Sequence, residues 1–143
     1  MSVDKIIKEL TKLKKTSIKI GVPTDVGAYP NGQSIAEVGA THELGIRVPR
    51  RSFLKDPIYD REDEIKKALE SGFKSVLDGG SSDNMLTKVG ITAQNISKGA
   101  FLSGGYGKWK DIDERTKRAK KSSKILVNDS KLLQSITHWI EVK

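Results

Sequence analysis

Residues 17–22 read Ser-Ile-Lys-Ile-Gly-Val, and residues 136–142 read Ile-Thr-His-Trp-Ile-Glu-Val. Both segments alternate apolar with polar residues, which is typical of a strand with one buried face, because successive side chains of a strand point to opposite faces. Pro23 ends the first segment, since proline has no amide hydrogen to donate to a partner strand. We expect the two segments to pair in a small antiparallel or mixed sheet.

Two helices are predicted in the first third of the chain from apolar residues at helical spacing. The first spans residues 3–14, with Ser2 as its N-cap. The second runs from Ile35 to about Leu44, with His42 or Leu44 on its buried side, and a glycine follows its last residue. Between the first strand and this helix, residues 23–33 hold the turn-forming residues of a loop.

Two longer helices are predicted in the middle of the chain. A third helix starts near Ile58, just after a first-turn proline, and places Phe73 and Leu77 among its buried residues. Its first turns are acidic, which suits the positive end of the helix dipole. A fourth helix follows from about residue 82 to about Leu102.

The order of these elements predicts an α+β fold, with about four helices packed on the small sheet in a single domain over residues 1–143. A flexible basic loop is expected over residues 103–124, because it begins with three closely spaced glycines. A short helix is expected around residues 114–120, and Asn128-Asp129 can start a helical turn before the last strand.

Composition excludes several classes of protein. The chain has 143 residues, and its 26 Lys and Arg against 18 Asp and Glu give a formal net charge of +8. It has no cysteine, which excludes disulfides, iron–sulfur clusters and thiol catalysis. No apolar run approaches the roughly 20 residues of a membrane-spanning helix, so we expect no membrane partner.

The residues offer little for catalysis. His42-Glu43 resembles the start of the metalloprotease pattern His-Glu-x-x-His, but position 46 is Ile. His138 stands alone in the last predicted strand, and a structural role is expected for both histidines. The stretch Gly-Ala-Phe-Leu-Ser-Gly-Gly-Tyr-Gly at residues 99–107 lacks the ending of a phosphate-binding loop. We therefore predict no enzyme activity, no metal site and no cofactor.

A basic run within the predicted loop is the clearest charged feature. Its members, preceded by Trp109, are Lys117, Arg118, Lys120, Lys121 and Lys124. Basic residues beside aromatic ones can bind nucleic acid without sequence specificity, because neutralised phosphates release counterions. A solvated loop explains the same residues equally well.

Several short motifs, read in order, carry a family resemblance. They are Ile20-Gly21-Val22, Tyr29-Pro30-Asn31-Gly32, Thr41-His42-Glu43-Leu44-Gly45, Val48-Pro49-Arg50-Arg51-Ser52-Phe53-Leu54, Ile125-Leu126-Val127-Asn128-Asp129 and Leu132-Leu133-Gln134-Ser135-Ile136. Together they resemble the neck and tail-completion proteins of tailed bacteriophages, the virion morphogenesis or tail-component proteins. The chain departs from that family at Ser52, where a second proline is usual, and at Leu44, where phenylalanine is usual.

The resemblance implies a structural virion protein that forms a ring at the head–tail neck or the tail terminus. Such a ring joins or completes the tail and lets DNA pass. The implied partners are further copies of the chain in a ring expected to be hexameric, other neck, head-closure and tail-tube proteins, and genomic DNA through non-specific contact. The implied location is the virion, with the host cytoplasm before assembly.

The expected interface between subunits centres on the fourth quoted motif. Its residues are Glu43, Pro49, Arg50, Arg51 and Phe53. Apolar anchors beside arginine are common at interface centres, although Phe53 and Leu54 can instead start the next core helix, and we favour the core for Leu54. Arg51 is expected to pair with Glu43 or with a carboxylate of a neighbouring subunit.

The predicted loop at residues 103–124 is expected to face the DNA channel or to grip a neighbouring ring, through Trp109 and the basic run. The alternative function is a small cytosolic protein that binds nucleic acid non-specifically, which rests on the net charge and that basic run.

Overall fold

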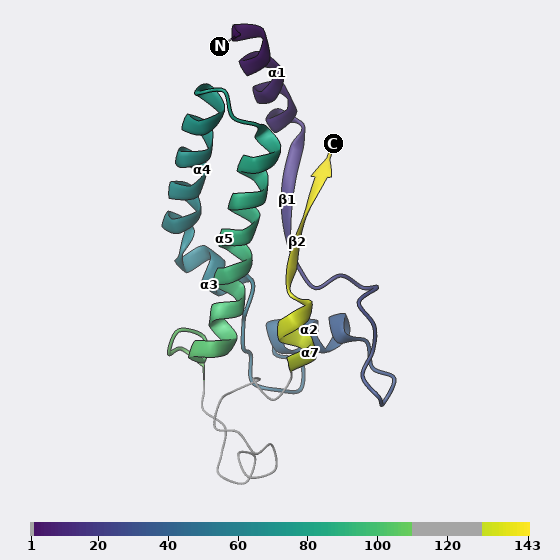
Figure 1. The fold of residues 1–143 in the computed structure, drawn as a ribbon. Helices are drawn as coiled ribbons and strands as arrows, with labels where there is room; N and C mark the ends of the chain where they lie inside the picture. Colours follow the sequence, from purple (N-terminus) through teal and green to yellow (C-terminus); the bar gives the residue numbers. More distant parts are fainter. Residues whose placement is uncertain (1, 110–129) are drawn as a thin grey trace.

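The structure is a computed structural model, and it describes residues 2–109 and 130–143. Within these residues the chain forms six helices and two strands (Figure 1). In chain order they are α1 (Val3–Lys14), β1 (Thr16–Gly21), α2 (Ile35–Leu44), α3 (Lys55–Asp60), α4 (Glu62–Leu77), α5 (Ser82–Ser103), α7 (Ser130–Ser135) and β2 (Thr137–Val142). The predicted α+β class is confirmed.

The two strands form the predicted sheet, and its sense is antiparallel. Ile18 lies opposite Ile140, and Ile20 lies opposite His138. The amide of Lys143 also donates to the carbonyl of Lys15, 2.6 Å away, which extends the pairing beyond the strand ends. The sheet therefore brings the first strand and the last strand of the chain together.

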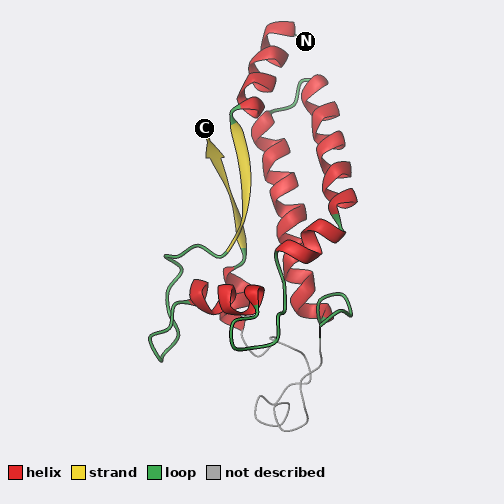
Figure 2. Cartoon of the chain, turned by 180° about the vertical axis from the view of Figure 1, so that it is seen from behind, coloured by secondary structure: helices red, strands yellow, loops and turns green. Residues whose placement is uncertain are grey.

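Helix α5 is the centre of the fold. It packs antiparallel against α4 on one side and against both strands on another (Figure 1). Helices α2 and α7 lie together near the C-terminal end of α5, whereas α1 lies at the opposite end, beside the α4–α5 connection (Figure 2). Two core regions follow from this elongated arrangement.

The α4–α5 core consists of Val76, Met85 and Val89, and it is covered by apolar side chains of α1, β1 and α4. The helices approach closely here because residue 72 is glycine: a Cβ at Gly72 would lie 2.4 Å from Cγ of Met85. A similar close approach joins α5 to β2, since a Cβ at Gly90 would lie 2.3 Å from the His138 ring. The Nδ1 atom of His138 is also 2.7 Å from Oε1 of Gln94, which lies on α5.

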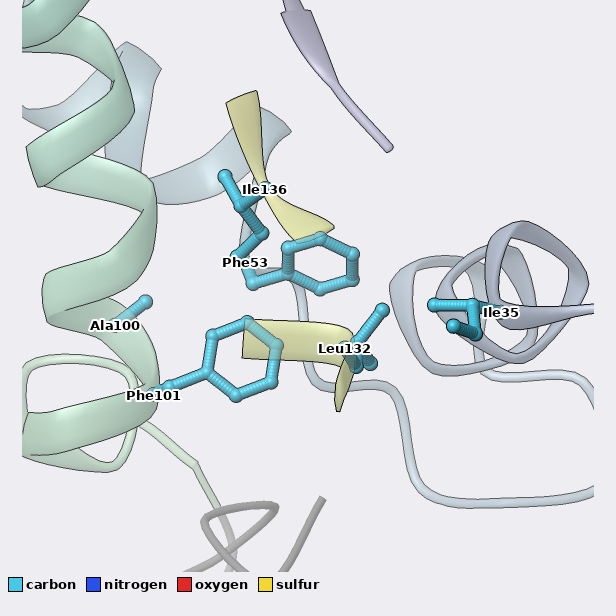
Figure 3. Close-up of a cluster of buried hydrophobic side chains, with 6 residues drawn as sticks. All are labelled: Ile35, Phe53, Ala100, Phe101, Leu132 and Ile136. Atoms are coloured by element: carbon cyan, nitrogen blue, oxygen red, sulfur yellow. The ribbon is translucent and has the colours of Figure 1, made fainter. Parts of the chain in front are cut away.

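The second core region, the α2–α7 core, gathers side chains from four parts of the chain (Figure 3). Its buried members are Ile35, Phe53, Ala100, Phe101, Leu132 and Ile136. The rings of Phe53 and Phe101 lie 5.0 Å apart between centroids at a tilt of 55°, an arrangement that aromatic pairs favour. This core ties the loop before α3 and the segment before β2 to α5.

The structure corrects the single helix predicted from Ile58 to Leu77. The helix is broken at Arg61, where φ is −113° and ψ is 27°, so that α3 and α4 meet at an angle. The Arg61 guanidinium lies over the ring of Tyr106, 3.3 Å from its centroid. Stacking on a residue 45 positions away is a tertiary contact, and a local apolar pattern cannot report it.

Two residues predicted to be buried, Phe73 and Leu77, are instead exposed, and of the alternatives His42 or Leu44 for the buried side of α2, His42 is the more buried. Leu44 is 65% exposed, Leu77 is 51% exposed and Phe73 is 43% exposed. Among the described residues, α4 is covered on one side only, by α1 and α5, so part of its apolar stripe stays at the surface. None of the described helices has the length and apolar character that crossing a membrane requires.

Candidate assembly surface

The motif predicted to form an interface follows the end of α2 and folds back on it. Gly45 ends the helix in the left-handed region with φ of 72°, a conformation that glycine adopts without strain. A Cβ there would lie 2.8 Å from Cβ of Arg50. The amide of Arg51 then donates to the carbonyl of His42 at 2.9 Å, which closes the loop.

Glu43 holds this loop against the start of α3. Its carboxylate accepts hydrogen bonds from the Ser52 hydroxyl at 2.7 Å, from the amides of Phe53 and Leu54 at 3.0 and 2.8 Å, and from the Lys55 amide at 3.4 Å. The residue at the N-cap position of α3, Leu54, has no side-chain oxygen, so the free amides of this helix start donate to Glu43 from another helix and, at Asp56, to the Ser52 hydroxyl at 2.9 Å. Glu43 therefore holds the loop and the start of α3 in place within the chain.

Arg50 pairs with Asp56 through two hydrogen bonds of 2.7 and 3.0 Å. The Arg50 hydrogen bond lowers the pKa of Asp56, and the same contact raises the pKa of Arg50. Both side chains are more than two-fifths exposed, so solvent screens the pair and its contribution to stability is small. Its geometric effect is to orient the arginine across the first turn of α3.

Arg51 and Phe53 are buried within the chain. Arg51 is 8% exposed, and burial lowers its pKa. Its expected pairing with Glu43 is not among the ion pairs of the described residues, because the Glu43 carboxylate is directed to Ser52 and to backbone amides. Phe53 is 1% exposed, whereas Leu54 is only partly buried. The alternative that Phe53 belongs to the core is the one that the structure supports.

Sequence reasoning missed an apolar groove next to this loop. The groove lies between the end of α2, α3 and the first half of α4, and its volume is about 710 Å³. Its apolar lining consists of Leu44, Leu54, Ile58, Tyr59 and Ile65, with Glu43, Lys55, Glu62 and Lys66 at the rim. Leu44 and Tyr59 are 65% and 73% exposed. Of the five predicted interface residues, Pro49 and Arg50 are exposed, and Glu43 borders the groove.

The described part of the predicted flexible loop, residues 103–109, consists of the last residue of α5 and a turn held by hydrogen bonds. Ser103 still belongs to α5, and residues 104–109 turn back toward α3. The Tyr106 hydroxyl donates to the carbonyl of Ile96 at 2.8 Å, and Lys108 pairs with Asp60. Burial raises the pKa of Tyr106. Residues 110–124 of the predicted loop lie outside the described residues.

Trp109 is half-buried and contributes to the fold. Its indole Nε1 donates to the carbonyl of Ser52 at 3.3 Å, and its ring meets the Phe101 ring edge-on at a centroid distance of 5.8 Å. Lys117, Arg118, Lys120, Lys121 and Lys124 lie outside the described residues. The structure thus places one member of the proposed DNA-channel or docking loop, and that member is anchored beside the α2–α7 core.

Each charged group beside this turn contacts another side chain of the chain. Arg50, Asp56, Asp60, Arg61 and Lys108 surround a small polar cleft of about 140 Å³. The two carboxylates pair with Arg50 and Lys108, and Arg61 stacks on Tyr106. Residues 2–109 and 130–143 contain no group of three or more His, Asp or Glu side chains placed to hold a metal ion.

Comparisons with protein-family models, with curated proteins and with solved structures found no match to this chain. The fold is therefore that of a small α+β domain.

Proposed function

We propose that the protein is a structural subunit of a tailed-phage virion that forms a ring at the head–tail neck or at the tail terminus. The ring joins or completes the tail, and DNA passes through its channel. The subunit is not an enzyme and needs no cofactor in this role. The proposal rests on the family resemblance of the motifs quoted above and on one structural observation, the open apolar groove.

The groove supports an assembly role because its lining is almost wholly apolar and, within residues 2–109 and 130–143, no side chain fills it. Exposed apolar surface with polar residues at its rim is one feature of protein–protein interaction sites. Leu44 and Tyr59 stand at its edge with more than half of their surface exposed. A partner that covers the groove would bury both side chains.

The rigid surroundings of the groove fit the same role. Hydrogen bonds to Glu43 connect α2 with the start of α3. The Trp109 indole connects the turn after α5 with the loop between α2 and α3. The surface is therefore preformed, and its own groups lose little conformational entropy when a partner binds. Closed rings need such a heterologous contact, in which one surface of a subunit meets a different surface of the next.

Electron microscopy of a lysate in which this gene carries an early stop codon tests the proposal. Filled heads beside separate tails of normal length place the protein in the neck. Tails of uncontrolled length place it at the tail terminus. Intact and infectious particles refute the proposal.

Non-specific nucleic-acid binding is the second candidate, and the net charge of +8 favours it. Its test is the affinity of the purified protein for free duplex DNA at several salt concentrations. A steep fall in affinity with rising salt supports it, because each neutralised phosphate contributes to that slope. Weak binding that does not depend on salt refutes it.

A further inference from the structure

The loop between β1 and α2 carries a reactive dipeptide that the proposed function does not use, Asn31-Gly32. Both residues are exposed, and the loop lies at the side of the molecule away from α4 and α5 (Figure 1, Figure 2). The amide nitrogen that follows an asparagine can attack the side-chain carbonyl carbon and close a five-membered ring. Glycine favours this attack, because it has no Cβ beside the nitrogen and its backbone rotates freely.

A three-residue turn holds the dipeptide in the folded chain. The Tyr29 amide donates to the carbonyl of Gln33 at 2.8 Å, and the Gly32 amide donates to the carbonyl of Tyr29 at 2.9 Å. Ala28 and Ser34 form an antiparallel bridge just outside the turn. Gly32 has a φ of 87°, as expected for the glycine bulge that closes a three-residue hairpin.

Two hydrogen bonds orient the Asn31 side chain. The Gln33 amide donates to Oδ1 of Asn31 at 3.0 Å, and Nδ2 of Asn31 donates to Oε1 of Gln33 at 3.4 Å. The first bond draws electron density from the side-chain carbonyl, so that Cγ becomes a better electrophile, as a carbonyl does when donors bind its oxygen. None of the described atoms lies within 4 Å of the position that a Cβ on Gly32 would take, so the backbone beside the glycine has room to rotate.

One hydrogen bond opposes the reaction. The Gly32 nitrogen has to lose its proton before it attacks, and in the closed turn that proton is bound to the Tyr29 carbonyl. Hydrogen bonds in exposed loops open locally at a free energy far below that of global unfolding. The bond between the Gln33 amide and Asn31 spans only two residues, so it can persist when the turn opens. The reaction is therefore gated by the opening of a single turn.

We propose that Asn31 is a site of spontaneous deamidation in the folded protein. The Gly32 nitrogen gives its proton to water or hydroxide and forms a bond to Cγ of Asn31. The bond between Cγ and Nδ2 breaks, and Nδ2 takes a proton from water and leaves as ammonia. A second water molecule then opens the cyclic imide at either carbonyl, which yields aspartate or isoaspartate. No oxidant, reductant or enzyme is needed.

Both products change the entry to α2. Each adds one negative charge, and isoaspartate also lengthens the main chain of the turn by one carbon. The Tyr29–Gln33 and Ala28–Ser34 pairs cannot keep their register across the longer turn. Ser34 is the N-cap of α2 and accepts from the Glu37 amide, so the start of that helix is loosened.

Peptide mass spectrometry of the ageing protein tests the inference. The purified full-length chain is kept at mildly alkaline pH and physiological temperature, and samples are cleaved after lysine and arginine, with an unincubated sample as the zero point. Asn31 is the one asparagine between Lys19 and Arg47. Asn84 and Asn95 lie on α5 in two other peptides and precede residues with side chains, so they serve as internal controls.

The peptide of residues 20–47 is expected to gain the mass difference between OH and NH₂ about tenfold faster than either control peptide, because a helix interior opens less readily than an exposed turn. Fragmentation should place the change at Asn31, and stepwise N-terminal sequencing should stop there in the isoaspartate fraction. Conversion no faster than at Asn84 and Asn95 overturns the inference. A mass gain located at Gln33 also overturns it.

The variant Asn31→Ser provides a matched control. Serine keeps a side-chain oxygen that can accept from the Gln33 amide and has no amide group to lose, and circular dichroism verifies that the variant folds. Its peptide of residues 20–47 should show no mass gain, and a gain equal to that of the unaltered chain refutes the assignment to Asn31. None of these results depends on virion assembly, so the inference and the proposed function stand or fall separately.

Discussion

Replacing Glu43 with alanine tests whether this residue caps α3 from a distance. The carboxylate accepts four hydrogen bonds, of which those from the Ser52 hydroxyl and from the Leu54 amide are the shortest at 2.7 and 2.8 Å. A hydrogen bond to a charged group contributes about 1.5–3 kcal/mol. The Lys55 amide lies in an exposed region, so water can replace part of the loss there.

We therefore expect Glu43→Ala to lower the free energy of unfolding by about 3 kcal/mol, since effects within one network do not add fully. For a domain of this size that change corresponds to a fall in Tm of about 10 °C. Glu43→Gln keeps one acceptor oxygen but turns an NH₂ group toward amide donors and loses the charge. It should cost about half as much.

The assay is chemical denaturation followed by circular dichroism, with Glu37→Gln as the matched control. Glu37 is an exposed carboxylate on the same helix, and its replacement should change stability by less than about 0.5 kcal/mol. A double-mutant cycle with Ser52→Ala should give a coupling energy of about 1 kcal/mol or more. A loss below about 1 kcal/mol for Glu43→Ala, or an equal loss in the control, would refute the reasoning.

Three further predictions concern packing and pH. Gly90→Ala should destabilise the protein by about 1–3 kcal/mol in chemical denaturation, because the new methyl would lie 2.3 Å from the His138 ring; an increase in stability would contradict the close packing of α5 on β2. Ser97→Ala should raise stability by about 1 kcal/mol in a thermal melt, since the buried hydroxyl has no hydrogen-bond partner among the described residues; a lower Tm would show that it has one. Hydrogen bonds from Ser82 lower the pKa of Glu9 below its ordinary value of 4.5. The stabilisation is therefore present above that value and is lost as pH falls through the lower folded pKa. Glu9→Gln should flatten the pH dependence of stability in this acidic range, and an unchanged acid-unfolding profile would argue against the contact.

Local signals in the sequence predicted most element boundaries, because helix caps and strand alternation act over a few residues. The side chains of Ser2, Ser34 and Ser81 each accept a hydrogen bond from an amide three residues later, as N-caps do. Gly45 and Gly104 end their helices in the left-handed region. The pairing of the first and last strands also followed from their alternation, since only two segments carried that pattern.

The tertiary structure decided which apolar residues are covered. Leu44 and Phe53 are close in sequence and similarly apolar, yet Leu44 is 65% exposed and Phe53 is 1% exposed. The difference arises because α5 and α7 meet the loop before α3, whereas nothing in the described chain covers the end of α2. A residue's spacing indicates which face of a helix it occupies, and the neighbouring element decides whether that face is buried.

At the candidate site too, the sequence predicted some features and only the tertiary structure decided the others. The sequence by itself determined an α+β fold with no cysteine chemistry and a net positive charge, and its motifs pointed to the segment around Pro49. Only the tertiary structure showed that Glu43 turns inward to cap α3 and that Arg51 is buried. It also placed α1 and the groove at opposite ends of α4. These relations join residues far apart in the chain, and no local pattern encodes a distance between them.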